Sequence, residues 1–268
     1  MSDDFYVTLS SNDGGAYYES NTLTHFRNKL PETIHLQEGQ RWEVGLVECI
    51  LPFNWYHIGH GDERILATKR VYGGGVVAAS QSNTAKMPRG RYKDAKHFVN
   101  LFKSQLDKFT LGDGFPVSFD ARSQQAKLKV PQVSSLFLSR RMMAILNFDE
   151  KADTIEKHSD GRFELKTGEY ESQGSVDLAG GLHTLWVYSD IAEHHIVAEK
   201  KLPLLRILTA EDKTSMEYKH VTFEDVHYFP VRQTLFESIE IDIRDNQGFP
   251  VPFEAGEAVI TLHFRQRR

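Results

Sequence analysis

Histidine and carboxylate side chains stand close together near residue 60, where their spacing could hold a metal ion. His57 and His60 lie three residues apart, and Asp62 and Glu63 follow closely. Imidazole nitrogens and carboxylate oxygens are common zinc ligands. The stretch also carries glycines and few apolar residues, which is typical of an exposed loop. We therefore interpret the group as surface residues and assign no metal ligand to it.

A second group, Glu193 with His194 and His195, has less favourable spacing for a metal. Adjacent residues of an extended strand point to opposite faces, so two neighbouring imidazoles do not easily grip one ion. The pattern His-X-His, which places two imidazoles on the same face of a strand, does not occur in the chain. We expect this group to be surface residues as well.

The motifs of the common enzyme classes are absent from the sequence. There is no G-x-x-x-x-G-K-[ST] phosphate loop, no H-E-x-x-H zinc pair, no G-x-S-x-G elbow and no dinucleotide-binding G-x-G-x-x-G. Gly73, Gly74 and Gly75 lack a following lysine and helix, which favours a flexible turn. Glu240 and Asp242 alternate along an expected strand, where solvated edge charges that discourage aggregation explain them. We predict that the chain is not an enzyme, with no cofactor and no catalytic, cofactor-binding or metal residue.

The composition of the chain argues against some binding partners and structural classes. The chain has 37 acidic and 32 basic residues among 268, a net charge of −5, which argues against a general electrostatic grip on nucleic acid. Arg265, Arg267 and Arg268 form a small basic end. Cys49 is the single cysteine, which excludes an internal disulfide framework, and we expect it to pack as a small apolar residue. No apolar run approaches the ~18 residues of a membrane-spanning helix, and the acidic start is unlike a signal peptide, so we expect no membrane insertion.

The elements that must position these residues are clearest near the C-terminus. Ile239, Ile241 and Ile243 alternate with polar residues, and Ile260, Leu262 and Phe264 do the same. This period of two predicts half-buried antiparallel strands. The segment 246–252 between them contains a turn sequence and two prolines, which belong at a sheet edge or in a connection.

The N-terminal part of the chain shows the same β texture. Residues 5–9 alternate, and the run 41–51 ends at Pro52. Glu48 lies within the apolar part of this run, so it needs a partner if it is buried and a β-bulge that redirects it if it is not. Further extended segments are expected at 23–26, 33–36, 184–188, 196–197, 202–208 and 221–229.

The middle of the chain has a different texture. Apolar residues recur at helical spacing from Ala95 to Phe109, and Asp94 is a suitable N-cap. A hairpin is expected from strands at 115–120 and 127–130, and Ser139 can cap a short helix that ends near Leu146. Residues 56–92 are expected to be loose and turn-rich, and 149–182 to hold short strands and loops.

These patterns predict a mainly β protein. Residues 1–55 and 184–268 are expected to form a single antiparallel jelly-roll sandwich, discontinuous in sequence. Residues 56–183 are expected to form a small inserted α+β region.

Several segments resemble one known family, the minor capsid (penton) proteins of Polinton, or Maverick, elements and of the related adintoviruses and virophages. The segments are FYVTLSSN at 5–12, RWEVGLVECILP at 41–52, PRGRYKDAKHFVNLF at 88–102, LWVYSDI at 185–191, KLPLLRIL at 201–208 and FESIEIDIRDNQGFPVPFEAGEAVITLHFR at 236–265. The likeness is strong at both ends of the chain and looser in the middle. It concerns structural motifs and carries over no active site.

The resemblance implies a structural virion protein, a single jelly roll that forms a homopentamer at the icosahedral five-fold vertices. Its implied partners are further copies of itself and a double jelly-roll major capsid protein, with a possible weak contact between the basic end and packaged DNA. The implied location is the virion, assembled inside the host cell, in nucleus or cytoplasm. A closed ring needs heterologous contacts. Aromatic residues could supply them, although most are expected in core or rim and none is assigned as a site: Tyr17, Tyr18, Trp55, Tyr56, Trp186 and Tyr188.

Two alternatives stay open at this point. A jelly-roll attachment module could bind a glycan or receptor through loops of the insertion, at 56–92 or 149–182. A metal-dependent enzyme of the cupin type is the third hypothesis, since cupins are also jelly rolls.

Overall fold

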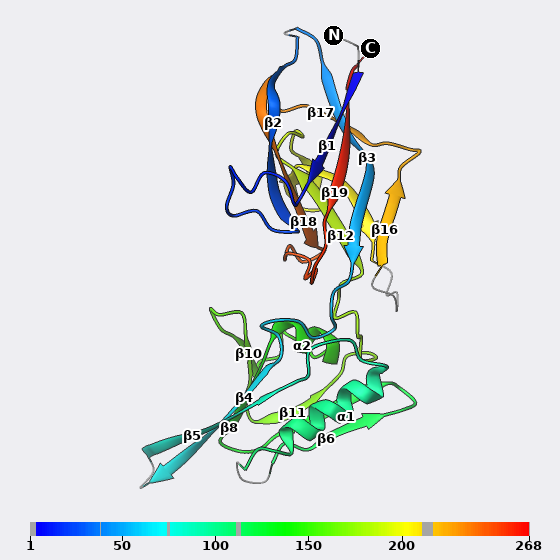
Figure 1. Cartoon of the computed structure of the whole chain (residues 1–268). Coiled ribbons are helices and arrows are strands. Elements are labelled where there is room, and N and C mark those ends of the chain that lie inside the picture. Colours follow the sequence, from blue (N-terminus) through cyan, green and yellow to red (C-terminus); the bar gives the residue numbers. More distant parts are fainter. Residues whose placement is uncertain (1–3, 38, 74–75, 111–113, 211–216, 268) are drawn as a thin grey trace. The chain divides into compact units, whose positions relative to one another are not determined.

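The computed structural model describes residues 4–37, 39–73, 76–110, 114–210 and 217–267. The chain divides into two compact units (Figure 1), one formed by Met1–Trp55 with Leu182–Arg268 and the other by Tyr56–Gly181. Each unit encloses its own cluster of buried apolar side chains.

The first unit contains two antiparallel sheets. The order in one sheet is β1 (Asp4–Ser10), β19 (Val259–Gln266), β3 (Trp42–Phe53) and β16 (Glu217–Thr222), and β17 (Tyr228–Pro230) also pairs with β3. The order in the other sheet is β15 (Leu204–Thr209), β12 (Thr184–Ser189), β18 (Leu235–Asp245) and β2 (His25–His35). A separate hairpin joins β13 (His195–Val197) to β14 (Lys200–Leu202).

The strand order of this unit is that of a jelly roll. Among the described residues, eight of the nine strands in the two sheets pair from the outside of the sequence inward: β1 with β19, β2 with β18, β3 with β16, and β12 with β15. A ribbon of four such antiparallel pairs, wrapped so that β19 also pairs with β3 and β18 with β12, forms the two sheets. The predicted fold class is therefore confirmed.

Alternation in sequence explains the core of the sandwich. The three isoleucines of β18 and the apolar triplet of β19 that alternate with polar residues are fully buried, as predicted. The prolines at 250 and 252 lie in the connection between these strands, where Pro250 forms an isolated β-bridge with Arg244.

A β-bulge in β3 resolves the position of Glu48. Thr261 of β19 is opposite Glu48 but its neighbour Leu262 is opposite Leu46, so Val47 is an extra residue in β3. The bulge shifts the inward face from even positions before it to odd positions after it. Glu48 is thereby directed outward, where its carboxylate contacts His220 Nε2 at 2.6 Å. Glu48 is not buried, and the bulge expected for that case is present.

The second unit is an α+β structure. One sheet has the order β5 (Val76–Lys86), β4 (Arg64–Gly73), β8 (Ser134–Leu138), β10 (Phe163–Leu165) and β9 (Ile155–Lys157). A smaller sheet has the order β11 (Gly168–Glu171), β7 (Gln125–Val130) and β6 (Val117–Asp120). The helices are α1 (Ala95–Leu106) and α2 (Arg140–Leu146).

Both helices begin at the residues predicted from sequence. The Asp94 side chain accepts a hydrogen bond from the His97 backbone N–H at 2.7 Å, and Ser139 Oγ accepts one from the Met142 N–H at 3.1 Å. Phe109 is buried with the apolar face of α1 but lies beyond the end of the helix. No described helix has both the length and the apolar character needed to cross a membrane.

Two expectations about local structure were wrong: that residues 56–92 are loose throughout, and that 23–26 and 33–36 are separate extended segments. Residues 64–73 and 76–86, expected to be loose, form the long paired strands β4 and β5, because cross-strand pairing orders polar residues that show no clear alternation. Gly74 and Gly75, expected to form a turn, lie outside the described residues. The segments at 23–26 and 33–36 belong to one strand, β2, whose register with β18 shifts around Pro31.

Candidate functional site

The histidine and carboxylate group near residue 60 forms structural contacts in the second unit. The buried His57 accepts a hydrogen bond at Nδ1 from the Tyr92 backbone N–H at 2.8 Å. Glu63 is largely buried and accepts hydrogen bonds from Arg89 Nη2 at 2.6 Å and from the Gly61 N–H at 2.7 Å. The hydrogen bond from Arg89, with further backbone donors, lowers the pKa of Glu63 to about 2. The expectation of surface residues was wrong for His57 and Glu63.

The second histidine group supports a hairpin of the first unit. The His195 ring stacks on Phe229 of β17 with ring centroids 4.2 Å apart. Among the residues that the structure describes, no three His, Cys, Asp or Glu side chains lie close enough together to hold a metal ion.

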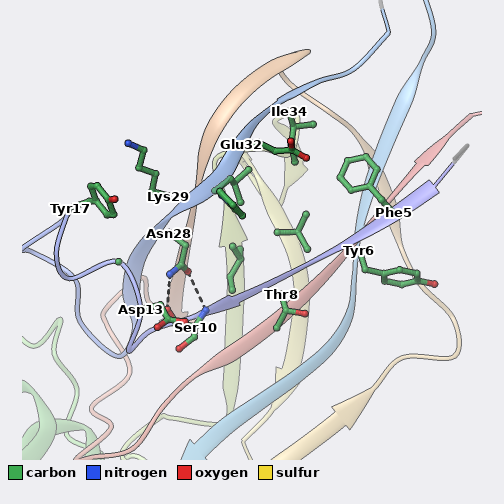
Figure 2. A pocket seen from close by; sticks show the side chains of 15 residues that line it. Phe5, Tyr6, Thr8, Ser10, Asp13, Tyr17, Asn28, Lys29, Glu32 and Ile34 are labelled. Atoms are coloured by element: carbon green, nitrogen blue, oxygen red, sulfur yellow. Dashed lines mark hydrogen bonds between the residues drawn. The ribbon is translucent and has the colours of Figure 1, made fainter. Parts of the chain in front are cut away.

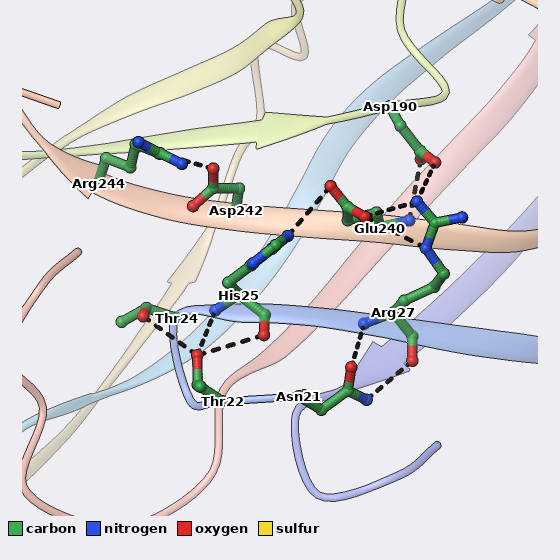
Figure 3. A network of polar contacts seen from close by, with 9 residues as sticks. All are labelled: Asn21, Thr22, Thr24, His25, Arg27, Asp190, Glu240, Asp242 and Arg244. Atoms are coloured by element: carbon green, nitrogen blue, oxygen red, sulfur yellow. Dashed lines mark hydrogen bonds and ion pairs between the residues drawn. The ribbon is translucent and has the colours of Figure 1, made fainter. Parts of the chain in front are cut away.

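A network of charged side chains covers the outer face of β2 and β18 (Figure 3). Arg27 donates to Glu240 Oε2 at 2.5 Å from Nη2 and lies 3.5 Å from an Asp190 oxygen, while His25 Nε2 contacts the other Glu240 oxygen at 3.1 Å. Asp242 accepts from Arg244 Nε at 2.6 Å. Because β18 lies between β12 and β2, these acids are on a central strand, and the interpretation of Glu240 and Asp242 as edge charges was wrong.

The contacts in this network shift the pKa values of Glu240, Asp190 and Arg27, and not all in the same direction. Burial raises the pKa of Glu240, but hydrogen bonds and charge from Arg27 and His25 outweigh burial and lower it overall. Burial raises the pKa of Asp190, and only part of this effect is offset by the Glu240 N–H and by Arg27. The hydrogen bond to Glu240 raises the pKa of Arg27. The charged side chains of this face are therefore held in ion pairs. Such pairs are better suited to binding the surface of another molecule than to transferring protons.

On the other sheet, the side chains of Tyr228, His263 and Asp4 lie in a row. They come from β17, β19 and β1, so no pattern in the sequence indicated that they would be close together. Tyr228 Oη lies 2.8 Å from His263 Nδ1, and His263 Nε2 lies 3.5 Å from an Asp4 oxygen. The ring of Tyr6 stacks on the imidazole at 4.4 Å. Burial raises the pKa of Tyr228, so its hydroxyl stays protonated at neutral pH. The contacts among these three side chains connect the strands β17, β19 and β1.

The other residues singled out from sequence have different outcomes. Cys49 is fully buried, as predicted, and burial raises its pKa to about 12. Trp55 is buried in the core and not available for contacts, whereas Tyr17 is 66% exposed. At the basic end, Arg265 and Arg267 both contact Glu43, and Arg268 lies outside the described residues.

A groove of about 560 Å³ runs between β1 and β2, which are the adjacent edges of the two sheets (Figure 2). At one end the Asn28 amide joins the strands, donating to the Ser10 carbonyl at 3.0 Å and accepting from the Ser10 N–H at 3.2 Å. Half-buried apolar side chains line it: Phe5, Val7, Leu30 and Ile34. The groove is thus a place where the sandwich core is open to solvent.

Comparisons with known proteins find solved structures with a similar fold. No protein-family model matches the chain, and no curated protein matches it in sequence. The chain is similar to the selenomethionine-labelled mavirus penton protein in its crystal structure, with 9% sequence identity and a TM-score of 0.43. The match covers 98% of this chain and 99% of that chain. The fold assignment rests on the strand order of this chain itself.

Proposed function

We infer that the protein is a structural component of a virus capsid, a penton-type minor capsid protein that assembles as a homopentamer at five-fold vertices. The observation that carries the proposal is the jelly-roll strand order of the first unit, an architecture used by many capsid proteins. The resemblance of 236–265 and of the opening strands to penton proteins of Polintons and virophages supports the same role. The proposed partners are further copies of the chain and a double jelly-roll major capsid protein, and the proposed location is the virion.

The structure offers physical features compatible with ring formation. The groove between β1 and β2 leaves apolar side chains half-buried, and exposed apolar surface of this kind marks interaction sites. The charged outer face of β2 and β18 is a separate surface whose side chains are already held in place by ion pairs. Pre-ordered side chains lower the entropic cost of binding a partner.

Light scattering and particle averaging of the purified full-length chain test the pentamer. We expect a five-fold ring at high protein concentration or on addition of the major capsid protein. A chain that stays monomeric under both conditions and never enters particles contradicts the proposal.

Replacing residues 56–181 by a short linker distinguishes the capsid role from attachment to a glycan through the insertion. Under the capsid proposal, the shortened chain still forms rings and is incorporated into particles. If the shortened chain no longer assembles while the full chain binds components of a glycan array, attachment explains the protein better.

A further inference from the structure

The groove between β1 and β2 is lined by residues at an irregularity in β2. Ile34 is opposite Phe236, but the next pair joins Lys29 to Ser238, so the residues around Pro31 depart from regular pairing. Pro31 has no N–H to donate to the sheet. Glu32, on the exposed rim of the groove, has no ion pair with any residue that the structure describes. The groove therefore combines a half-buried apolar floor with an unpaired carboxylate.

The β13–β14 hairpin exposes an apolar side chain and a basic side chain, the counterparts of the apolar floor and the carboxylate of the groove. Ile196 is 77% exposed, the highest exposure among the large apolar side chains of the described residues. Lys201 is directly opposite Ile196 in the hairpin, so the two side chains share one face. Lys201 has no ion pair within the described part of the chain. Stacking of His195 on Phe229 holds the hairpin in place.

The groove and the hairpin belong to different strands of the sandwich. The groove lies at β1 and β2, which end their sheets on one side. The hairpin connects β12 to β15, the edge strand at the far side of the second sheet from β2, and the Glu193 N–H anchors it to the Pro230 carbonyl of β17 at 2.8 Å. One copy can therefore offer its groove and its hairpin at the same time.

We propose that the β13–β14 hairpin of one copy docks into the β1–β2 groove of the next copy. Ile196 contacts the apolar floor formed by Leu30 and its neighbours, and the Lys201 ammonium pairs with the Glu32 carboxylate. Two different patches that meet in this way form a heterologous contact, which repeats until the rotation closes. The inference rests on the proposed function, since it names the surfaces that join the copies of the ring.

Variants of the hairpin and the rim test the contact by sedimentation velocity across a concentration series. We expect Ile196→Asp, Lys201→Glu and Glu32→Lys each to weaken self-association at least about tenfold, the loss typical of a residue central to an interface. The double variant Glu32→Lys with Lys201→Glu restores association, because it reverses the charges of the pair. Lys200→Glu is the matched control, since Lys200 lies opposite Val197 on the other face of the hairpin and the variant makes the same charge change.

Crosslinking tests the direction of the contact. In the variant carrying both Ile196→Cys and Leu30→Cys, a short bismaleimide linker should join copies into a ladder that ends at five. Either cysteine alone should give no ladder, because a heterologous contact needs both patches. The native Cys49 is buried and does not contribute.

The outcomes separate this inference from the proposed function. A wild-type ring that is unaffected by all three single variants overturns the inference and leaves the pentamer standing. A ladder that ends at another number supports the hairpin contact and contradicts the pentamer. A wild-type chain that is monomeric at every concentration, both alone and with the major capsid protein, and that gives no ladder from the double cysteine variant and never enters particles, overturns both.

Discussion

At the scale of single residues, Gly45 of β3 shows how closely the strands pack. A Cβ at this position would lie 2.5 Å from Val226 Cγ1 and 2.8 Å from the His227 carbonyl oxygen. Neither neighbour can move without shifting the segment that leads into β17. We expect Gly45→Ala to lower the free energy of unfolding by about 1–3 kcal/mol, measured by urea denaturation.

Gly15→Ala is the control for this substitution. A Cβ at Gly15 meets no heavy atom within 4 Å. Its effect should stay within about 0.5 kcal/mol. Equal losses in the two variants would show that crowding at Gly45 is not the cause.

Glu63 should make the free energy of unfolding of the second unit depend on pH. Its pKa of about 2 in the folded chain lies below the value of about 4.3 expected when unfolded. A lowered pKa contributes stability that is present above the unfolded value and is lost as the pH falls toward 2. We expect Glu63→Gln to cost about 1–3 kcal/mol at pH 7, the smaller end reflecting the partly exposed Arg89.

Urea denaturation between pH 7 and pH 2.5 measures this effect. The difference between wild type and Glu63→Gln should shrink as the pH falls below about 4.3. Glu150→Gln, at an exposed position of the same unit, should cost nearly nothing throughout. A difference that stays constant with pH would contradict the ion pair as its origin.

At the scale of elements, α1 depends on its N-cap. The Asp94 side chain satisfies the otherwise unpaired N–H of His97 at the start of the helix. We expect Asp94→Ala to lower the free energy of unfolding by about 0.5–2 kcal/mol in urea denaturation. Asp94→Ser keeps a hydroxyl acceptor and should recover most of the loss, whereas equal losses would exclude the cap.

The bulge in β3 shows how an element departs from its sequence pattern. Val44 and Leu46 face the core before Val47, and Cys49 and Leu51 face it afterwards. Read from the sequence, the same run has apolar residues on both faces and an acid in its middle. The change of phase becomes visible only from the pairing with β19, because a bulge is defined by two strands and not by one.

At the scale of the whole molecule, the two units have separate hydrophobic cores and separate sets of paired strands. We expect the jelly roll to fold when residues 56–181 are replaced by a flexible linker of about ten Gly and Ser residues. Circular dichroism and urea denaturation should show β structure and one cooperative transition. Residues 56–181 expressed alone provide the complementary test, and failure of either piece to fold would show that the units depend on each other.

The alternating segments, the buried face of β18 and β19, and the first residues of α1 and α2 could all be read from the amino-acid sequence. These features depend on the local preference of side chains for water or core and on caps a few residues away. For the same reason the mainly β class and the buried state of Cys49 were predictable.

The pairing of the strands and the contacts between charged residues depend on how the complete chain folds. The β1 strand pairs with β19 across almost the whole length of the chain, and Arg27 meets Glu240 through the pairing of β2 with β18. The paired strands β4 and β5 are likewise ordered by cross-strand hydrogen bonds between residues with no clear pattern of their own. Hydrogen bonds between strands are satisfied by any backbone, so partner, register and bulge follow from packing the whole core and not from any single segment.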